Sequence, residues 1–182
     1  MAAPAAPVHD AAPLLQLLLD GKTPDADTAY AFAGALARDQ VHHVQVAGVL
    51  VLLASRPESP VVLASFVRAM REVCVGVVPP PGPLVDIVGT GGDGHNTVNI
   101  STAAAVLASA CGAIVAKHGS LSSSSLSGAA DVLSALGVAM LQPHDIPACL
   151  AVAGLAFMFA PLHHPGLRAA VPVRRALKVC LQ

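Results

Sequence analysis

Apolar residues form short helical runs through the first part of the chain. A run at Leu14–Leu19 ends at Gly21. The segment Thr23-Pro24-Asp25 then predicts a helix start, with Thr23 as N-cap, a proline in the first turn and an acid facing the positive end of the helix. That helix is expected to run to about Ala37.

Two further helices are expected before the first cluster of prolines. Val41–Ala54 is apolar enough for a buried helix, and Ser59-Pro60 repeats the cap-then-proline signal before a helix to about Val73. Four helices joined by short turns predict a small all-α domain over residues 14–76. Residues 1–13 are expected to form a flexible N-terminus, and the proline-rich residues 77–83 a linker.

After the prolines, strands alternate with helices. We expect strands at Leu84–Val88 and Ala113–Ala116, with a glycine-rich loop and a helix from about Ile100 to Cys111 between them. A serine-rich loop at Lys117–Leu126 follows the second strand.

The same alternation continues to the end of the sheet. A helix at Ser127–Leu136 ends at Gly137, and a further short strand and a helix precede a last strand at Leu155–Phe159. This order predicts an α/β domain over residues 84–182 with a largely parallel sheet. Its loops at Gly89, Lys117 and Ala160 should open at one edge, where such sheets bind ligands.

Composition narrows the class of protein. The chain has 182 residues, of which 54% are hydrophobic and 12% charged, and its net charge is −1. Without a basic run we expect no nucleic-acid partner, and without an apolar stretch of about 18 residues we expect no membrane span. The four widely spaced cysteines favour free thiols over a zinc site or disulfides. With no signal peptide, the cytoplasm is the default expectation, and a plastid stays an alternative.

The strongest chemical signal is the segment from Asp86 to Thr102. Its glycines at positions 89, 91, 92 and 94 permit positive φ angles, so that successive N–H groups can converge on phosphate oxygens. Asn99, Ser101 and Thr102 fall at the start of the next helix, where an anion is favoured. A plain tight turn is the simpler alternative, and four glycines with three polar residues behind a strand make it the weaker one.

Two familiar phosphate loops fit this segment poorly. Gly89–Gly94 matches G-x-G-x-x-G, but a dinucleotide site expects an acid about 20 residues further on. No Asp or Glu occurs between Asp93 and Asp131. A Walker loop is excluded because no Gly-Lys-Ser/Thr closes the segment. An oxidoreductase is therefore disfavoured.

Two later segments carry further polar side chains. Lys117 at the end of the second strand can reach a phosphate, although a lysine on a loop is more often solvated and the following serines could be a linker. The segment after Phe159 contains His163-His164 and Arg174-Arg175. Adjacent histidines make a two-histidine metal site improbable, whereas one arginine could bind a carboxylate through its planar fork.

These segments resemble those of anthranilate phosphoribosyltransferases. The family motifs G-T-G-G-D, N-x-S-T, K-H-G, H-P and V-R-R occur here in the same order. The resemblance implies transfer of phosphoribose from phosphoribosyl diphosphate to anthranilate in tryptophan biosynthesis, with magnesium as cofactor. Separately, a homodimer with a full-length copy through the N-terminal helices is an alternative expectation for a non-catalytic module. No protein nucleophile is needed, because positioning and electrostatics supply the catalysis.

Site residues follow from the resemblance position by position. Those matching the phosphoribosyl diphosphate contacts are Gly89, Gly91, Gly92, Asp93, Asn99, Ser101, Thr102 and Lys117. Ser101 also matches a magnesium contact. His118, Gly119 and Arg174 match the anthranilate side, where Arg174 would grip the carboxylate.

The sequence departs from the family pattern in three places. Ser120-Leu121 stands where the family has Asn-Arg, and Leu126 replaces a lysine. The family also continues beyond residue 182 with a G-x-R-T segment and an Asp-Glu pair that holds magnesium. We therefore expect a truncated form with little activity alone. The alternative is a non-catalytic module that binds phosphoribosyl diphosphate or dimerises.

Overall fold

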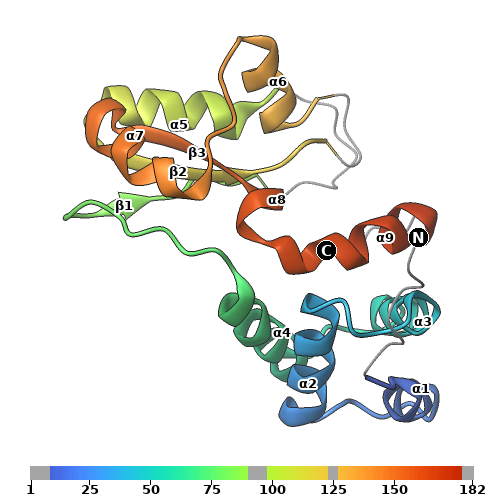
Figure 1. The fold of residues 1–182 in the computed structure, drawn as a ribbon. Helices are drawn as coiled ribbons and strands as arrows, with labels where there is room; N and C mark the ends of the chain where they lie inside the picture. The colour runs from blue at the N-terminus through green and yellow to red at the C-terminus, as the bar shows by residue number, and fades with distance from the viewer. Residues whose placement is uncertain (1–8, 90–97, 123–126, 178–182) are drawn as a thin grey trace, which may run out of the picture. The chain divides into compact units, whose positions relative to one another are not determined.

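The structure is a computed structural model that describes residues 9–89, 98–122 and 127–177. Contacts divide the chain into two compact units (Figure 1), and each is described by itself. The helical unit comprises Met1–Cys74 and His164–Gln182, and the α/β unit comprises Val75–His163. The contacts thus group the last helix with the N-terminal ones, whereas the sequence led us to expect an α/β domain from 84 to 182. Those domain limits stay a prediction.

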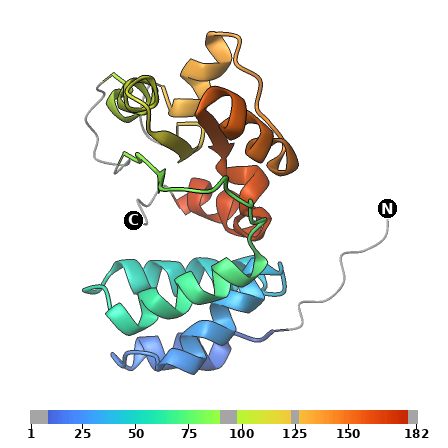
Figure 2. The ribbon, with the colours of Figure 1, turned by 90° about the vertical axis from the view of Figure 1, so that its left-hand side faces the viewer.

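The helical unit contains the expected four helices, which Figure 2 shows packed together. They are α1 (Ala12–Leu19), α2 (Ala26–Ala37), α3 (His43–Ala54) and α4 (Pro60–Val73), and α9 (Ala170–Leu177) completes the unit. Helix α2 packs on α4, and α1 packs on α3. Leu18, Phe32 and Val49 lie fully buried at the centre of the core. Burial of such side chains, at about 1.5–3 kcal/mol each, holds the short helices together.

The start of α2 differs from the expected one. Its N-cap is Asp25, whose carboxylate accepts a hydrogen bond of 2.8 Å from the backbone N–H of Thr28. The prediction that Thr23 caps this helix is wrong, because the carboxylate two residues later reaches the free N–H groups of the first turn. Helix α3 also begins later than expected, since Val41 pairs with His9 in an isolated bridge.

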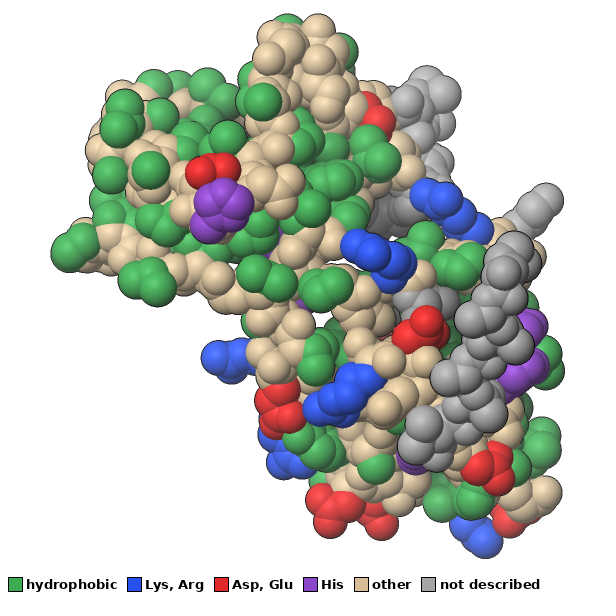
Figure 3. Space-filling model, viewed as in Figure 1, with side chains coloured by type: hydrophobic (Ala, Val, Ile, Leu, Met, Phe, Trp, Pro, Cys, Tyr) green, Lys and Arg blue, Asp and Glu red, His purple; other side chains and the backbone are tan. Residues whose placement is uncertain are grey.

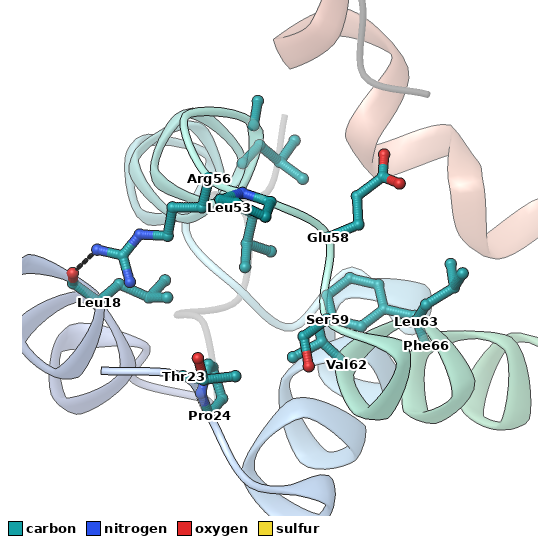
Figure 4. A pocket seen from close by; sticks show the side chains of 13 residues that line it. Leu18, Thr23, Pro24, Leu53, Arg56, Glu58, Ser59, Val62, Leu63 and Phe66 are labelled. Atoms are coloured by element: carbon teal, nitrogen blue, oxygen red, sulfur yellow. Dashed lines mark hydrogen bonds between the residues drawn. The ribbon is translucent and has the colours of Figure 1, made fainter. Parts of the chain in front are cut away.

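An arginine closes the end of α1. Arg56 donates to the main-chain oxygen of Lys22 at 3.0 Å and to that of Leu18. Figure 4 shows its guanidinium reaching Leu18 beside a cavity of about 370 Å³, which apolar side chains such as Leu53 and Phe66 line. The carbonyl of Leu18 also accepts from the N–H of Gly21 at 3.1 Å, so the guanidinium adds a second bond at the end of α1 and ties it to the turn at Lys22.

The α/β unit is built on a three-stranded parallel sheet in the order β1-β2-β3, as expected. The strands are β1 (Leu84–Val85), β2 (Ile114–Gly119) and β3 (Leu155–Phe159). Helix α5 (Ile100–Ala110) joins β1 to β2, and α6 (Ala129–Ala135) and α7 (Ile146–Ala153) follow β2 (Figure 1). A last short helix, α8 (Ala160–His163), follows β3.

Three strand predictions need correction. Strand β1 ends at Val85, three residues before the expected end at Val88. Strand β2 continues through Lys117 and His118 to Gly119, because these residues pair in register with Phe157–Phe159 of β3. The strand expected between Gly137 and α7 is not formed. The chain there is irregular and enters a 3₁₀ turn at Pro143–Asp145. Proline at the start of that turn has no N–H to donate to a strand ladder.

Two hydrogen bonds join the first and last residues of the α/β unit. The N–H of Val75 donates to the carbonyl of His163 at 2.7 Å, and Nδ1 of His163 lies 3.1 Å from the carbonyl of Val75. Because a carbonyl can only accept, Nδ1 carries the hydrogen. The side chain of His163 is buried, and this pair of bonds closes the unit where the chain enters and leaves it.

Within the described ranges, no helix is long and apolar enough to span a bilayer.

Candidate functional site

The candidate site lies at the carboxyl end of the sheet, where β1 leads toward α5. Gly89 is exposed just after β1, and Asn99, Ser101 and Thr102 begin α5. Gly91, Gly92 and Asp93 lie outside the described residues, so their predicted contacts with phosphoribosyl diphosphate stay predictions. The described part of the site therefore rests on the two ends of this connection and on β2.

Lys117 is the charged centre of the site. Its side chain is 3% exposed, and Nζ donates to the carbonyl of Ile87 at 2.6 Å and to Oγ of Ser101 at 3.2 Å. Burial lowers the pKa of Lys117, while the negative charge of Asp86 acts in the opposite direction. The strand holds the ammonium against the end of β1 and the start of α5, so the alternative of a solvated loop lysine does not apply.

Ser101 and Thr102 place two hydroxyls in the first turn of α5. A Cβ atom added at Gly89 would lie 3.4 Å from Oγ of Ser101, an ordinary van der Waals contact, so Gly89 approaches this hydroxyl closely. Oγ1 of Thr102 is buried and has no hydrogen-bond partner among the described residues. A buried hydroxyl without a partner costs free energy, which makes it a candidate donor to an incoming oxygen atom.

Asn99 is the N-cap residue of α5, but its side chain does not cap that helix. Nδ2 of Asn99 donates to the carbonyl of Gly128 at 2.8 Å. This bond links the start of α5 to the start of α6, and no motif or spacing along the chain predicts it.

His118 and Gly119 are the last two residues of β2, and both contact other residues of the α/β unit. The N–H of His118 donates to Oδ1 of Asp86 at 3.1 Å, and its ring meets that of His163 edge-on at 6.5 Å between centroids. A Cβ at Gly119 would come within 2.8 Å of the Phe157 ring. The third residue expected on the anthranilate side, Arg174, belongs to α9 of the helical unit.

Sequence reasoning missed three residues that shape this site. Asp86 orients His118, His163 packs against the His118 ring, and Asp131 binds the backbone of the segment before α6. The positions of Asp86 at a strand end and of Asp131 three residues after Gly128 were detectable signals. The contact between two histidines 45 positions apart was not.

Magnesium can be tested against the donors present. In the described ranges no three His, Cys, Asp or Glu residues cluster to hold a metal ion. Ser101 offers one neutral oxygen, which is half-buried and already accepts a hydrogen bond from Lys117. Magnesium commonly binds through one or two protein oxygens plus substrate phosphates. Ser101 therefore fits as a single ligand to an ion that arrives with a diphosphate.

Comparison with known proteins gives two family matches. Residues 12–74 match the glycosyl transferase family, helical bundle domain, and residues 81–181 match the glycosyl transferase family, a/b domain.

Two curated relatives are both named anthranilate phosphoribosyltransferase. This chain is 45% identical over 171 residues to the one from Salinibacter ruber, covering 91% of this chain and 48% of the relative. It is 43% identical over 177 residues to that of Shewanella baltica, covering 91% of this chain and 49% of the relative.

Solved structures agree with these relatives. The anthranilate phosphoribosyltransferase of Thermus thermophilus aligns at a TM-score of 0.84 and 40% identity, over 92% of this chain and 51% of that one. The anthranilate phosphoribosyltransferase of Saccharomyces cerevisiae in complex with PRPP and Mg aligns at a TM-score of 0.80 and 26% identity. The alignment covers 93% of this chain and 51% of that one. The chain spans about half the length of the relatives that it matches, and it belongs to the anthranilate phosphoribosyltransferase family of glycosyl transferases.

Proposed function

We propose that this chain forms the part of an anthranilate phosphoribosyltransferase that binds phosphoribosyl diphosphate. The observation that carries the proposal is the buried ammonium of Lys117, which lies 3.2 Å from Oγ of Ser101 at the start of α5. A cation, two hydroxyls and a helix N-terminus at the carboxyl end of a parallel sheet suit a diphosphate. Gly91, Gly92 and Asp93 complete the proposed contacts.

The chemistry of the transfer assigns a role to each side of the site. As the bond from C1 of the ribose to diphosphate breaks, negative charge grows on the leaving diphosphate. Lys117, Ser101 and Thr102 can stabilise that charge without a protein nucleophile. Magnesium bound to the diphosphate would neutralise further charge, with Ser101 as its protein ligand.

The acceptor side is proposed around the end of β2. His118 and Gly119 would face anthranilate, and Arg174 would bind its carboxylate through two parallel hydrogen bonds. The N–H bond from His118 to Asp86 and the edge contact with His163 fix the His118 backbone and ring before a substrate arrives. Such preorganisation lowers the cost of holding a weak amine nucleophile against C1.

The proposal for activity is tested with a chimera. Residues of this chain replace the corresponding half of the Thermus thermophilus relative, of which it covers 51%. We expect the chimera to transfer phosphoribose to anthranilate. The loss of anthranilate fluorescence measures the rate of this transfer. A chimera with K117M should be at least about tenfold slower, which corresponds to about 1.4 kcal/mol of lost stabilisation. A folded chimera without transfer would refute the assignment.

The 182-residue chain by itself is expected to bind phosphoribosyl diphosphate but to turn over far more slowly than the chimera. Its relatives are about twice as long, so half of their residues have no counterpart in it. Equal rates for the chain and the chimera would contradict this expectation.

A second candidate function is that of a non-catalytic, dimerising module. Helix α4 exposes Leu63 and Val67, which lie four positions apart on one face, with 60% and 50% of their surfaces accessible. Exposed apolar side chains on one helix favour association with another apolar surface. Analytical ultracentrifugation of the wild type and of L63E tests this dimer. If the dimer forms through the helical unit, L63E should be monomeric. An equal molecular mass for the two proteins would rule this surface out.

A further inference from the structure

One carboxylate oxygen joins Ser122 to Gly128. Oδ2 of Asp131 accepts hydrogen bonds from the N–H of Ser122 at 2.9 Å and from the N–H of Gly128 at 2.7 Å. Both bonds stabilise the charged form, and they lower the pKa of Asp131.

The residues around Ser122 and Gly128 also touch through the backbone. The N–H of Ala130 donates to the carbonyl of Ser120 at 3.2 Å. A Cβ added at Gly128 would lie 2.3 Å from the nitrogen of Ser122 and 2.7 Å from the carbonyl carbon of Leu121. Those atoms belong to the backbone and cannot rotate away. Glycine is therefore required at position 128 for its close approach to Leu121 and Ser122.

Gly128 is held from the opposite side by the start of α5. While its N–H is bound by Asp131, its carbonyl accepts a bond of 2.8 Å from Nδ2 of Asn99. Asn99 stands two residues before Ser101, whose Oγ is bound by Lys117. The hydrogen bonds therefore run from Asp131 through Gly128 to the residues at the start of α5.

We propose that Asp131 is a positioning residue, which holds Ser122 and Gly128 together and thereby sets the side chain of Asn99. The proposal rests on the proposed function, in which Asn99 lies on the diphosphate side and Gly119 on the anthranilate side. Loss of the two bonds to Asp131 then changes the affinity for phosphoribosyl diphosphate, although Asp131 itself does not touch that substrate.

The first test uses the ligand-free full chain. Variant D131A removes the oxygen, D131N keeps an oxygen acceptor without the charge, and D145A removes an exposed aspartate of the same unit whose paired group is His144. Amide hydrogen exchange is measured at Ser122 and Gly128. We expect an increase of about tenfold or more in D131A, a smaller one in D131N and none in D145A.

The second measurement separates positioning from mere loss of structure. Titration calorimetry gives the affinity for phosphoribosyl diphosphate with Mg²⁺ in wild type, D131A, N99A and the double variant. We expect each single variant to bind several-fold more weakly, D131N to recover part of the loss, and the double variant to be no weaker than N99A. Additive losses would overturn the link from Asp131 to Asn99.

The two measurements fail in different ways. If wild type binds no phosphoribosyl diphosphate, the proposed function fails, while the exchange data still decide whether Asp131 holds Ser122 and Gly128 together. Exchange at Ser122 and Gly128 that is equal in D131A and wild type overturns the proposal itself. Should D131A not fold, D131N decides, since exchange equal to wild type in that variant would also overturn it.

Discussion

Replacing Lys117 by methionine (K117M) removes a buried ammonium but keeps an unbranched side chain of similar length. The ammonium donates to the carbonyl of Ile87 at 2.6 Å and to Oγ of Ser101 at 3.2 Å, and the residue is 3% exposed. The variant thus loses two hydrogen bonds and also the cost of burying a charge. These two effects oppose each other.

Their magnitudes nearly balance. Two hydrogen bonds from a charged donor stabilise by about 3–6 kcal/mol together. Burying an ammonium costs several kcal/mol, and burial is the main cause of the lowered pKa of Lys117. We expect K117M to lower the free energy of unfolding by at most about 2 kcal/mol, which for a chain of this length is a fall in Tm of roughly 4–8 °C.

The pH dependence gives a sharper test of the same balance. Because the pKa of Lys117 is lowered in the folded state, the unfolded chain, with the usual value of 10.5, binds the proton more tightly. Stability therefore rises as the pH increases from the folded pKa toward 10.5. The Tm of wild type minus that of K117M should grow as the pH rises toward 10.5.

Thermal unfolding by circular dichroism measures both quantities. Lys22→Met is the matched control, because the side chain of Lys22 is 68% exposed and pairs only with Asp20 among its described salt-bridge partners. The control should unfold within about 2 °C of wild type, since exposed ion pairs contribute little. A fall in Tm of more than about 15 °C in K117M, or a difference that shrinks with rising pH, would refute the reasoning.

Four further variants test the fold. Leu18→Ala should lower the free energy of unfolding by about 2–5 kcal/mol because Leu18 is fully buried, whereas Leu19→Ala, at a residue that is 65% exposed, should change it by less than about 0.5 kcal/mol; chemical denaturation compares them. Asp25→Ala should lower Tm at neutral pH, since the bond from Thr28 lowers the pKa of Asp25, and this stabilisation is lost as the pH falls below 3.8; a difference from wild type that persists at low pH would contradict it. Gly154→Ala should cost about 1–2 kcal/mol, because Gly154 has a φ of 68°; an unchanged Tm would show that the turn relaxes.

The sequence predicted the helices best where a proline marks the start or an apolar run has helical spacing. Helix α4 begins at Pro60 and ends at Val73, as expected. The N-cap of α2 was placed wrongly because Thr23 and Asp25 both carry capping oxygens, and only the tertiary structure decides which one meets the free N–H groups. Local propensity alone does not distinguish them.

The site was predictable in residue type but not in its hydrogen bonds. Lys117 was expected on the diphosphate side, yet its burial depends on pairing of β2 with β3 through Gly119, a long-range contact. Likewise, the bond from Asn99 to Gly128 joins residues 29 positions apart. Periodicity and motifs describe neighbours along the chain, so contacts of this kind appear only once the sheet is formed.

The central claim is that Lys117 and the start of α5 bind the diphosphate of the substrate. Calorimetric titration of phosphoribosyl diphosphate with Mg²⁺ into the 182-residue chain, its K117M variant and the K22M control tests it most directly. We predict saturable binding at one site, at least about tenfold weaker in K117M and unchanged in K22M. Equal affinities for wild type and K117M, or no binding to the folded wild-type chain, would contradict the claim.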